Sequence, residues 1–405
     1  MFRVKNIHIE NINGIRDLKL NFSDGINLIS GPNGIGKSTI LNCILASFSK
    51  TRSEIRQNVQ STSGGWGILF VKNCNIRYHD FIINDKTLYY DFQDHYVSSI
   101  KDNNRKTHIP MGKDVISFST NNRLLDYPYN GKKHFLEMKK WIYKRYYNSG
   151  SLNMDNYNTL ELIKASFSEI DSNIRFSRII KRNVELDFFW YENTNNKQTL
   201  ADELILLVET SQGEIPIEYL SSGYKSIINI ILGIIRKVTM RDTPDAYSGL
   251  ILIDELDLHL HPEWQSKLLN LIKWIVPNAQ IIATTHSPHI IQSAEPGEII
   301  PLGFDKHLNN TYLRELPKSD TYGYQGWNIE EILVEVMGLE NPMSIPFQKH
   351  FNMFNSALKN NDKKTLTYAY DELKKMVHPN NPLIKLLSIQ SGLVNIWDEE
   401  GGYND

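Results

Sequence analysis

The chain has 405 residues, of which 41% are hydrophobic and 22% charged, and its formal net charge at pH 7 is −2. This is the composition of an ordinary globular protein, and the length predicts two or three structural units rather than one core. Neither Cys43 nor Cys74 has a metal-type or redox-type neighbour, and we see no secretion signal, so we expect a reducing cytoplasm. No apolar run approaches the roughly 20 residues of a membrane span, which argues against a membrane protein.

Two segments at the start of the chain alternate apolar and polar side chains. Residues 4–9 and 18–22 therefore predict two half-buried strands that form a small antiparallel flap. Arg16 lies in the turn that we expect between them. It could contact an adenine or a ribose, and a solvated turn arginine explains its position equally well.

Residues 31–38 read GPNGIGKS, a glycine followed by four residues and then Gly-Lys-Ser, which is the pattern of a P-loop. The run 25–30 predicts a strand entering the loop, and 38–45 a helix leaving it. Backbone N–H groups and the helix N-terminus would then face nucleotide phosphates, with a lysine charge and a serine hydroxyl for Mg²⁺. The predicted binding residues are Gly31, Pro32, Asn33, Gly34, Ile35, Gly36, Lys37, Ser38 and Thr39.

Residues 51–214 show no alternation of strands and helices, and we interpret them as an insertion rather than a second nucleotide domain. Their pattern predicts short strands over 66–91 and 115–119, followed by helices over 133–147 and 157–182.

Part of this insertion is basic. Residues 101–145 hold 11 Lys and Arg against 4 Asp and Glu, a charge of +7, and aromatic residues are interleaved from Tyr127 to Tyr147. Basic charge attracts phosphate and flat rings stack on unpaired bases, so the segment 101–147 is a possible contact for nucleic acid. A solvated helix face with its rings in the core accounts for the same pattern.

The run 249–253 is continuously apolar and predicts a central parallel strand, whose carboxyl end faces the ligand crevice in such sheets. Asp254 and Glu255 follow it directly. In a chain with a P-loop, we expect Asp254 to hold Mg²⁺ through its water shell and Glu255 to orient the water that attacks the γ-phosphate.

A second apolar run, 279–285, predicts another buried strand and ends at His286, which we interpret as a γ-phosphate sensor. Two other histidines, His259 and His261, have no further ligands at zinc-like spacing. We expect them to shape the turn before a helix that begins at Pro262.

Residues 220–223 read LSSG and precede an apolar, helix-like run. Ser221, Ser222 and Gly223 thus form a further candidate anion site at a helix start, although the pattern alone is weak.

In this order the motifs resemble the ATP-binding-cassette superfamily, in its SMC and RecF branch. The resemblance implies a composite site, in which the P-loop of one subunit and the signature serine and glycine of another sandwich ATP. Binding would then drive dimerisation, and hydrolysis would release it. Ser222 stands where glycine is usual and Tyr224 where Gln or Glu is usual. The roles implied are catalysis by Glu255, His286 and Lys37, Mg²⁺ binding by Ser38 and Asp254, nucleotide contact by Ser221, Ser222, Gly223 and a D-loop Asp257, and a Q-loop at Gln57 or Gln60.

The fold class implied is α/β: an ABC-type ATPase head with a mixed sheet flanked by helices, an α+β insertion and a C-terminal helical segment. The expected limits are 1–50 and 215–315 for the head, 51–214 for the insertion and 316–405 for the helical domain. Within the last, 345–395 predict two or three short amphipathic helices, with an apolar stripe at Phe347, Phe351, Phe354 and Leu358.

Residues 254–265, 284–288 and 322–338 resemble a narrower group, the compact bacterial antiphage-defence ATPases that include Septu PtuA and retron-associated relatives. The resemblance implies an ATPase that oligomerises and regulates a separate nuclease subunit. The chain lacks the sustained heptads of long SMC arms and the Cys/His cluster of an HNH nuclease. A TOPRIM nuclease would need acidic motifs on strands after residue 300, where we expect a helical tail.

Two alternatives stay open. A RecF-type repair clamp would grip DNA through the basic segment, with Lys139 and Lys140 as contacts, and its affinity would fall steeply with salt. A scaffold would keep ATP bound and hardly hydrolyse it. A transporter subunit is disfavoured, because the long insertion interrupts the spacing usual in that class.

Overall fold

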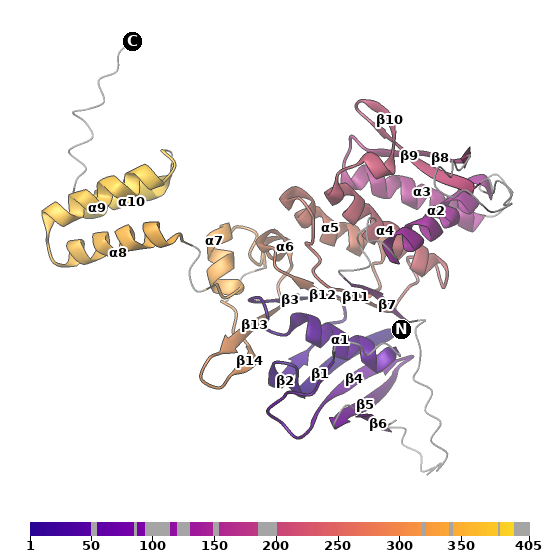
Figure 1. Ribbon diagram of the computed structural model, residues 1–405, viewed down its shortest axis with the longest axis horizontal. Coiled ribbons are helices and arrows are strands. Elements are labelled where there is room, and N and C mark those ends of the chain that lie inside the picture. The colour runs from indigo at the N-terminus through magenta and orange to yellow at the C-terminus, as the bar shows by residue number, and fades with distance from the viewer. Residues whose placement is uncertain are drawn as a thin grey trace, which may run out of the picture. The chain divides into compact units, whose positions relative to one another are not determined.

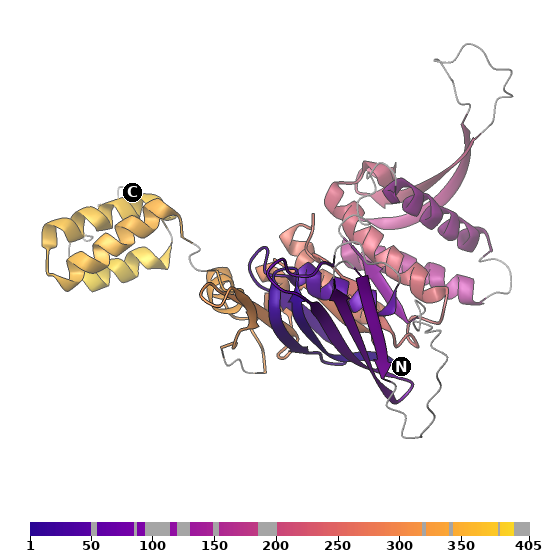
Figure 2. The ribbon, with the colours of Figure 1, turned by 60° about the horizontal axis from the view of Figure 1, so that its bottom comes forward.

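The computed structural model describes residues 1–49, 55–84, 87–93, 114–119, 130–148, 154–184, 201–317, 321–339, 343–379 and 381–392. They divide into two compact units, Met1–Leu339 and Glu340–Asp405. The larger unit contains two large sheets, a three-stranded sheet and most of the helices (Figures 1 and 2).

The first sheet is antiparallel, in the order β2-β1-β4-β5-β6. It confirms the predicted flap but is larger, because β1 pairs with β4 along its other edge. The boundary expected at residue 50 therefore lies between strands of one sheet, and residues 64–93 belong with the N-terminal strands. The strands are β1 (Phe2–Ile12), β2 (Ile15–Asn21), β4 (Gly64–Lys72), β5 (Asn75–Asn84) and β6 (Thr87–Gln93).

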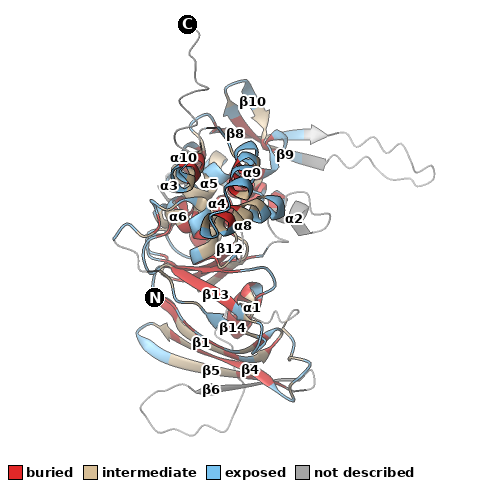
Figure 3. Ribbon diagram, turned by 90° about the vertical axis from the view of Figure 1, so that its left-hand side faces the viewer, coloured by how far each residue is buried: buried red, intermediate tan, exposed pale blue. Residues whose placement is uncertain are grey.

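The second sheet is mixed, in the order β14-β13-β3-β12-β11-β7. Every pair of adjacent strands in this sheet is parallel except β13 and β14, which are antiparallel to each other. Strands β3, β11 and β12 are buried at every position, as predicted, although β3 and β12 include buried polar residues such as Asn27 and Gln280. The neighbouring strand β13 is buried over most of its length and is red there in Figure 3. The strands are β3 (Ile26–Ser30), β7 (Val115–Phe118), β11 (Leu250–Ile253), β12 (Gln280–Thr285), β13 (Ile299–Asp305) and β14 (Asn310–Leu313).

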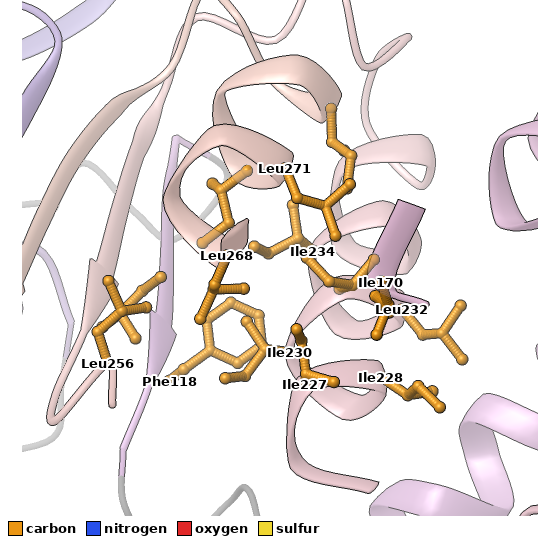
Figure 4. Packing of buried hydrophobic residues seen from close by; sticks show 14 of the residues in the cluster. Phe118, Ile170, Ile227, Ile228, Ile230, Leu232, Ile234, Leu256, Leu268 and Leu271 are labelled. Carbon is orange, nitrogen blue, oxygen red and sulfur yellow. The ribbon is translucent and has the colours of Figure 1, made fainter. Parts of the chain in front are cut away.

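The core is divided by this mixed sheet. Alternate residues of its strands point to opposite faces. Leu250, Leu252 and Ile282 pack with α1 (Lys37–Phe48) and the antiparallel sheet. Ile251 and Ile281 pack on the other face against helices, where α4 and α5 bury a dense set of isoleucines and leucines (Figure 4). Because both faces of the mixed sheet are covered, its central strands do not have to alternate apolar and polar side chains.

The helices of that second face come mainly from the C-terminal half of the unit. They are α4 (Ser222–Thr239), α5 (Pro262–Ile275) and α6 (Pro288–Ser293), with a 3₁₀ turn (Ile217–Tyr219) before α4. A short α7 (Ile329–Glu331) continues into a π-helical turn (Ile332–Val336). We expected a helical tail after residue 300. This was wrong for its first residues, because the strands β13 and β14 lie within 299–313.

Two insertion helices pack on the same core: α2 (Asn130–Asn148) and α3 (Met154–Ile170). The helix predicted over 133–147 is confirmed. The helix predicted over 157–182 was wrong beyond Ile170, because a turn closed by the N–H of Asn173 on Asp171 at 2.8 Å ends it. A three-stranded sheet follows, formed by β8 (Arg175–Val184), β9 (Ala201–Thr210) and β10 (Gly213–Pro216).

The described part of the smaller unit contains three helices, which confirms the prediction for 345–395: α8 (Ile345–Lys359), α9 (Lys363–Met376) and α10 (Pro382–Ser391). Phe354 is fully buried between them, and Phe347, Phe351 and Leu358 pack at the edge of the same core. None of the helices in the described ranges combines the length and hydropathy of a bilayer span.

Candidate nucleotide-binding site

The P-loop depends on glycine geometry. Gly34 and Gly36 have φ angles of 75° and 102°, in the region that favours glycine, and Gly36 is the N-cap of α1. A Cβ on Gly36 would lie 2.9 Å from the side chain of Ile15 on β2, so the flap also packs against the loop. The hydroxyl of Thr311 on β14 donates to the carbonyl of Ile35 at 2.8 Å and fixes the loop from another side.

Lys37 is buried within this loop. Its ammonium donates to the carbonyls of Gly31 at 2.8 Å and Pro32 at 2.7 Å. Burial lowers its pKa to about 8, although Asp254 and the neighbouring carboxylates oppose that shift. The ammonium of Lys37 is thus held by two neutral carbonyl groups of the loop, where a nucleotide phosphate would give it an anionic partner.

Ser38 and Asp254 are 216 positions apart and meet at the edge where β3 and β11 end. The hydroxyl of Ser38 donates to Oδ1 of Asp254 at 3.1 Å, and Thr284 of β12 donates to the same oxygen at 2.7 Å. A hydroxyl and a carboxylate side by side are the oxygen ligands that Mg²⁺ prefers beside substrate phosphates, so the pair fits the predicted metal site.

Glu255 follows in an unusual backbone conformation. Its φ is 50°, in the left-handed region, which costs energy for a residue other than glycine or asparagine. Its N–H donates to the hydroxyl of Thr284 at 2.7 Å, so one threonine fixes both acidic residues. Glu255 lines the same pocket as Lys37.

The end of β12 is fixed by Asp257. This carboxylate accepts from the hydroxyl of Thr285 at 2.7 Å and from the N–H of His286 at 2.9 Å. Burial and the positive charge of Lys37 lower the pKa of His286, against the pull of the nearby carboxylates. The lowered pKa favours the neutral imidazole, which has one nitrogen that donates and one that accepts a hydrogen bond.

These groups converge on one pocket of about 440 Å³, because the carboxyl ends of parallel strands meet at one edge. The residues predicted to bind phosphate, to hold Mg²⁺, to activate water and to contact the γ-phosphate therefore lie close together. The pocket is lined by Asn33, Gly34, Gly36, Lys37, Ser38, Thr39, Glu255, Thr284 and His286.

The predicted signature residues lie elsewhere. Ser221 and Ser222 are exposed at the start of α4 and do not line the pocket. Gly223 is buried, and a Cβ there would lie 2.8 Å from the ring of Trp264 and 3.0 Å from the carbonyl of His259. The glycine thus permits close packing at the first turn of α4.

Two supporting residues escaped the sequence analysis. Thr284 bonds both acidic residues, and Asn13 donates to the hydroxyl of Thr39 at 3.0 Å from the turn before β2. The only signal for Thr284 was a hydroxyl that directly follows the apolar residues 281–283 of the predicted strand. Asn13 gave none, since its partner is distant in sequence.

Several other predicted residues do not reach the pocket. Arg16 is the second residue of β2 and donates to Gln60 at 2.8 Å and to the carbonyl of Leu308 at 3.1 Å. Gln57 donates to the carbonyl of Ser61 at 2.6 Å. None of these lines the pocket, so the Q-loop stays unassigned.

The turn role predicted for the two neighbouring histidines is confirmed. His259 has a left-handed φ of 63°, and Nδ1 of His261 accepts from the N–H of Glu263 at 3.4 Å and caps α5.

The basic segment is only partly described. Residues 101–113 and 120–129, with Tyr127 and Tyr129, lie outside the described residues. In the remainder, Lys139 is buried, forms an ion pair with Glu218 and lies over the ring of Phe135. Phe135 and Trp141 belong to the core. These three side chains are internal, so Lys139 was a poor choice as a nucleic-acid contact.

Comparison with known proteins agrees with this geometry. Residues 26–292 match the family "AAA domain, putative AbiEii toxin, Type IV TA system". Septu protein PtuA of Bacillus thuringiensis is 37% identical over 96% of this chain and 98% of its own. Retron Ec83 probable ATPase of Escherichia coli is 26% identical over 44% of this chain and 32% of its own. Among solved structures, an SMC head bound to the C-terminal winged-helix domain of ScpA aligns with a TM-score of 0.51, at 16% identity over 77% of this chain and 97% of that chain.

The 37% identity over nearly the whole chain, the family match and the shared fold confirm the resemblance found in the sequence. The α/β head with a mixed sheet flanked by helices is confirmed as well. The chain belongs to the Septu PtuA family of ABC-type, SMC-like ATPases of antiphage defence.

Proposed function

We propose that this chain hydrolyses ATP with Mg²⁺ at a composite site formed by two copies, and that it controls a separate nuclease in the bacterial cytoplasm. One observation carries the first part. A single pocket is lined by Lys37, Ser38, Glu255 and His286, and Asp254 accepts hydrogen bonds from the lining residues Ser38 and Thr284. The predicted signature serines are exposed and do not line this pocket. A second subunit would bring its signature to this pocket.

Each group has a chemical role that follows from its position. The loop N–H groups and Lys37 would hold the β- and γ-phosphates, and Ser38 with Asp254 would hold Mg²⁺. The metal would neutralise phosphate charge. Glu255 would orient and polarise the attacking water, and the neutral imidazole of His286 would contact the γ-phosphate. Asp257 and Thr284 would keep these groups in place.

The nuclease is proposed as a separate protein for two reasons. The family is one of antiphage defence. In the described ranges, the only group of three or more His, Cys, Asp or Glu residues with metal-site spacing is His8, Glu10 and Asp17, in which both acids are exposed and the histidine is half-buried. An acidic surface group on a flap does not make a nuclease centre, so cutting is assigned to another chain.

The hydrolysis is tested by Glu255→Gln, with Glu263→Gln as the control at an exposed acid on α5. We expect the first variant to bind ATP and to lose turnover by several orders of magnitude, because water activation is lost. The control should turn over ATP like the wild type. Wild-type turnover in Glu255→Gln would overturn the assignment.

The composite site is tested by mixing two inactive variants, Lys37→Ala and Ser221→Arg. In a mixed dimer one site has an intact P-loop and an intact signature, so about a quarter of wild-type activity should return at equal amounts. Activity that stays at the sum of the separate variants would show that the site is not shared.

The nuclease partnership is tested by purifying the chain with the products of its neighbouring genes, with and without ATP. A stable complex with a nuclease, seen by mass spectrometry and light scattering, is the expected result. A lone ATP-dependent dimer that retains DNA would instead favour a repair clamp. An oligomer purified with unhydrolysed nucleotide would favour a scaffold.

A further inference from the structure

A second pocket, of about 730 Å³, lies at the opposite edge of the mixed sheet from the P-loop. The ends of α4 and α5, which precede the N-terminal ends of β11 and β12, form one wall, and residues of α2 and α3 form another. The predicted signature residues Ser222 and Gly223 begin α4, and Thr239 at the end of the same helix lines the pocket. At 1.5 Å per residue, the helix between them spans roughly 25 Å. The volume is typical of small-molecule sites.

Arg145, near the end of α2, is the residue that points to a ligand. Its guanidinium lies over the buried ring of Trp141, 4.4 Å from the centroid. Its Nε is buried without a hydrogen-bond partner, and within the described ranges the side chain has no carboxylate in ion-pair distance. Burial, and then the like charge of Arg236, lower its pKa. An anion in the pocket would relieve both the lost solvation and the repulsion.

The rest of the lining identifies the kind of anion. Arg241 adds a second positive charge, whereas Asp242 and Asp245 add two acceptors on the same loop. Trp274, at the end of α5, lines the pocket with about half of its surface exposed. A ligand that matches all of these features carries an anionic group, hydrogen-bond donors and a flat ring, because exposed tryptophan rings stack well on bases. An inorganic anion would leave the carboxylates and the ring unused.

We propose that this pocket is a second nucleotide site, which binds a nucleoside monophosphate either free or as the 5′-phosphorylated end of a nucleic acid strand. Arg145 and Arg241 contact the phosphate, Trp274 stacks on the base, and Asp242 or Asp245 accepts hydrogen bonds from ribose or base. The site is separate from the P-loop and does not depend on the function proposed above.

The test uses the full chain carrying Lys37→Ala, which removes the main phosphate contact of the P-loop. Calorimetric titrations are made with AMP, CMP, GMP and UMP, with inorganic phosphate, and with a pentanucleotide with and without a 5′-phosphate. We expect binding of a mononucleotide or of the phosphorylated pentanucleotide, and weaker binding of inorganic phosphate. A stronger signal with the strand than with every mononucleotide identifies nucleic acid as the source, and the reverse identifies a free nucleotide.

Three further substitutions locate the site. Arg145→Gln and Trp274→Ala should each weaken binding about tenfold or more. Lys144→Gln, an exposed neighbour that does not line the pocket, should bind like its parent. Trp274 is half exposed, so its variant should unfold at the parental temperature, and Arg145→Lys should recover part of the affinity.

Three results would overturn the proposal. These are no binding of any probe up to the millimolar range, unchanged affinity in both pocket variants, and inorganic phosphate binding as tightly as the nucleotides.

Discussion

The carboxylate of Asp257 accepts a hydrogen bond from the backbone N–H of His286 at 2.9 Å, and so joins the turn after β11 to the end of β12. The same oxygen accepts from Thr285 at 2.7 Å. The position of His286, the proposed γ-phosphate sensor, is therefore set by a residue 29 positions earlier in the same chain. This contact gives Asp257, the proposed D-loop residue, a positioning role besides the proposed contact with a second subunit.

We predict that Asp257→Ala lowers ATP turnover at least tenfold while changing ATP affinity little, because His286 loses its anchor but the P-loop is untouched. The unpaired donors should also cost about 1–2 kcal/mol of unfolding free energy. Asp257→Asn keeps an acceptor oxygen and should retain most of the stability. Steady-state kinetics and thermal unfolding check both variants, and equal turnover in Asp257→Ala and wild type would contradict the prediction.

Gly36→Ala should destabilise the protein by about 1–3 kcal/mol, because its φ of 102° strains any side chain and the new methyl would press on Ile15. ATP affinity should fall with it, since the loop N–H groups would turn. Gly14→Ala is the matched control in a neighbouring turn with no atom within 4 Å. Denaturant unfolding should show lower stability, and nucleotide titration weaker ATP binding, in Gly36→Ala than in Gly14→Ala. A Gly36→Ala variant with wild-type stability and wild-type ATP affinity would contradict the prediction.

Tyr224 connects the signature helix to the insertion, because its hydroxyl donates to Asp171 and its ring lies 4.1 Å from that of Trp264. We predict that Tyr224→Phe removes about 1 kcal/mol of stability and weakens ATP-dependent self-association, since the first turn of α4 loses its link to α3. Tyr219→Phe, at an exposed tyrosine, should change neither. Light scattering with ATP and thermal unfolding provide the measurements, and unaltered association in Tyr224→Phe would argue against this link.

Lys237 should make stability depend on pH in the alkaline range. Its ammonium donates to the carbonyl of Ser117 at 2.9 Å and lies over the ring of Phe118, and burial lowers its pKa from 10.5 to about 8. Between these values the unfolded chain binds more protons than the folded one, so this lysine makes stability rise with pH from about 8 to 10.5.

The Lys237→Met variant isolates this contribution. The free energy of unfolding is measured for both proteins across pH 7–10, and the wild type is expected to gain on the variant as pH rises. Lys225→Met, in the first turns of the same helix, should track the wild type. A constant difference between wild type and Lys237→Met would show that the charge of Lys237 is not the cause.

The P-loop, the acidic strand end and the order of the motifs could be predicted from sequence because each is a local pattern of neighbouring residues. The strands β3, β11 and β12 were equally clear, since a strand buried on both faces is rich in apolar residues and does not alternate with polar ones. The helix predicted through residue 182 shows the limit. Its last residues, 175–182, belong to the strand β8. They form a strand because they pair with β9, and that pairing cannot be read from the local sequence.

The sequence by itself predicted the nucleotide chemistry, because the loop glycines with Lys37 form one local pattern and the paired carboxylates at the end of an apolar run form another. Tertiary structure alone decided that residues 64–93 share a sheet with β1, that Thr284 fixes both Asp254 and Glu255, and that Lys139 is internal. It alone formed the pocket beside Arg145. These outcomes depend on contacts between distant segments, and such contacts are set by packing and hydrogen-bond satisfaction, which leave no local pattern.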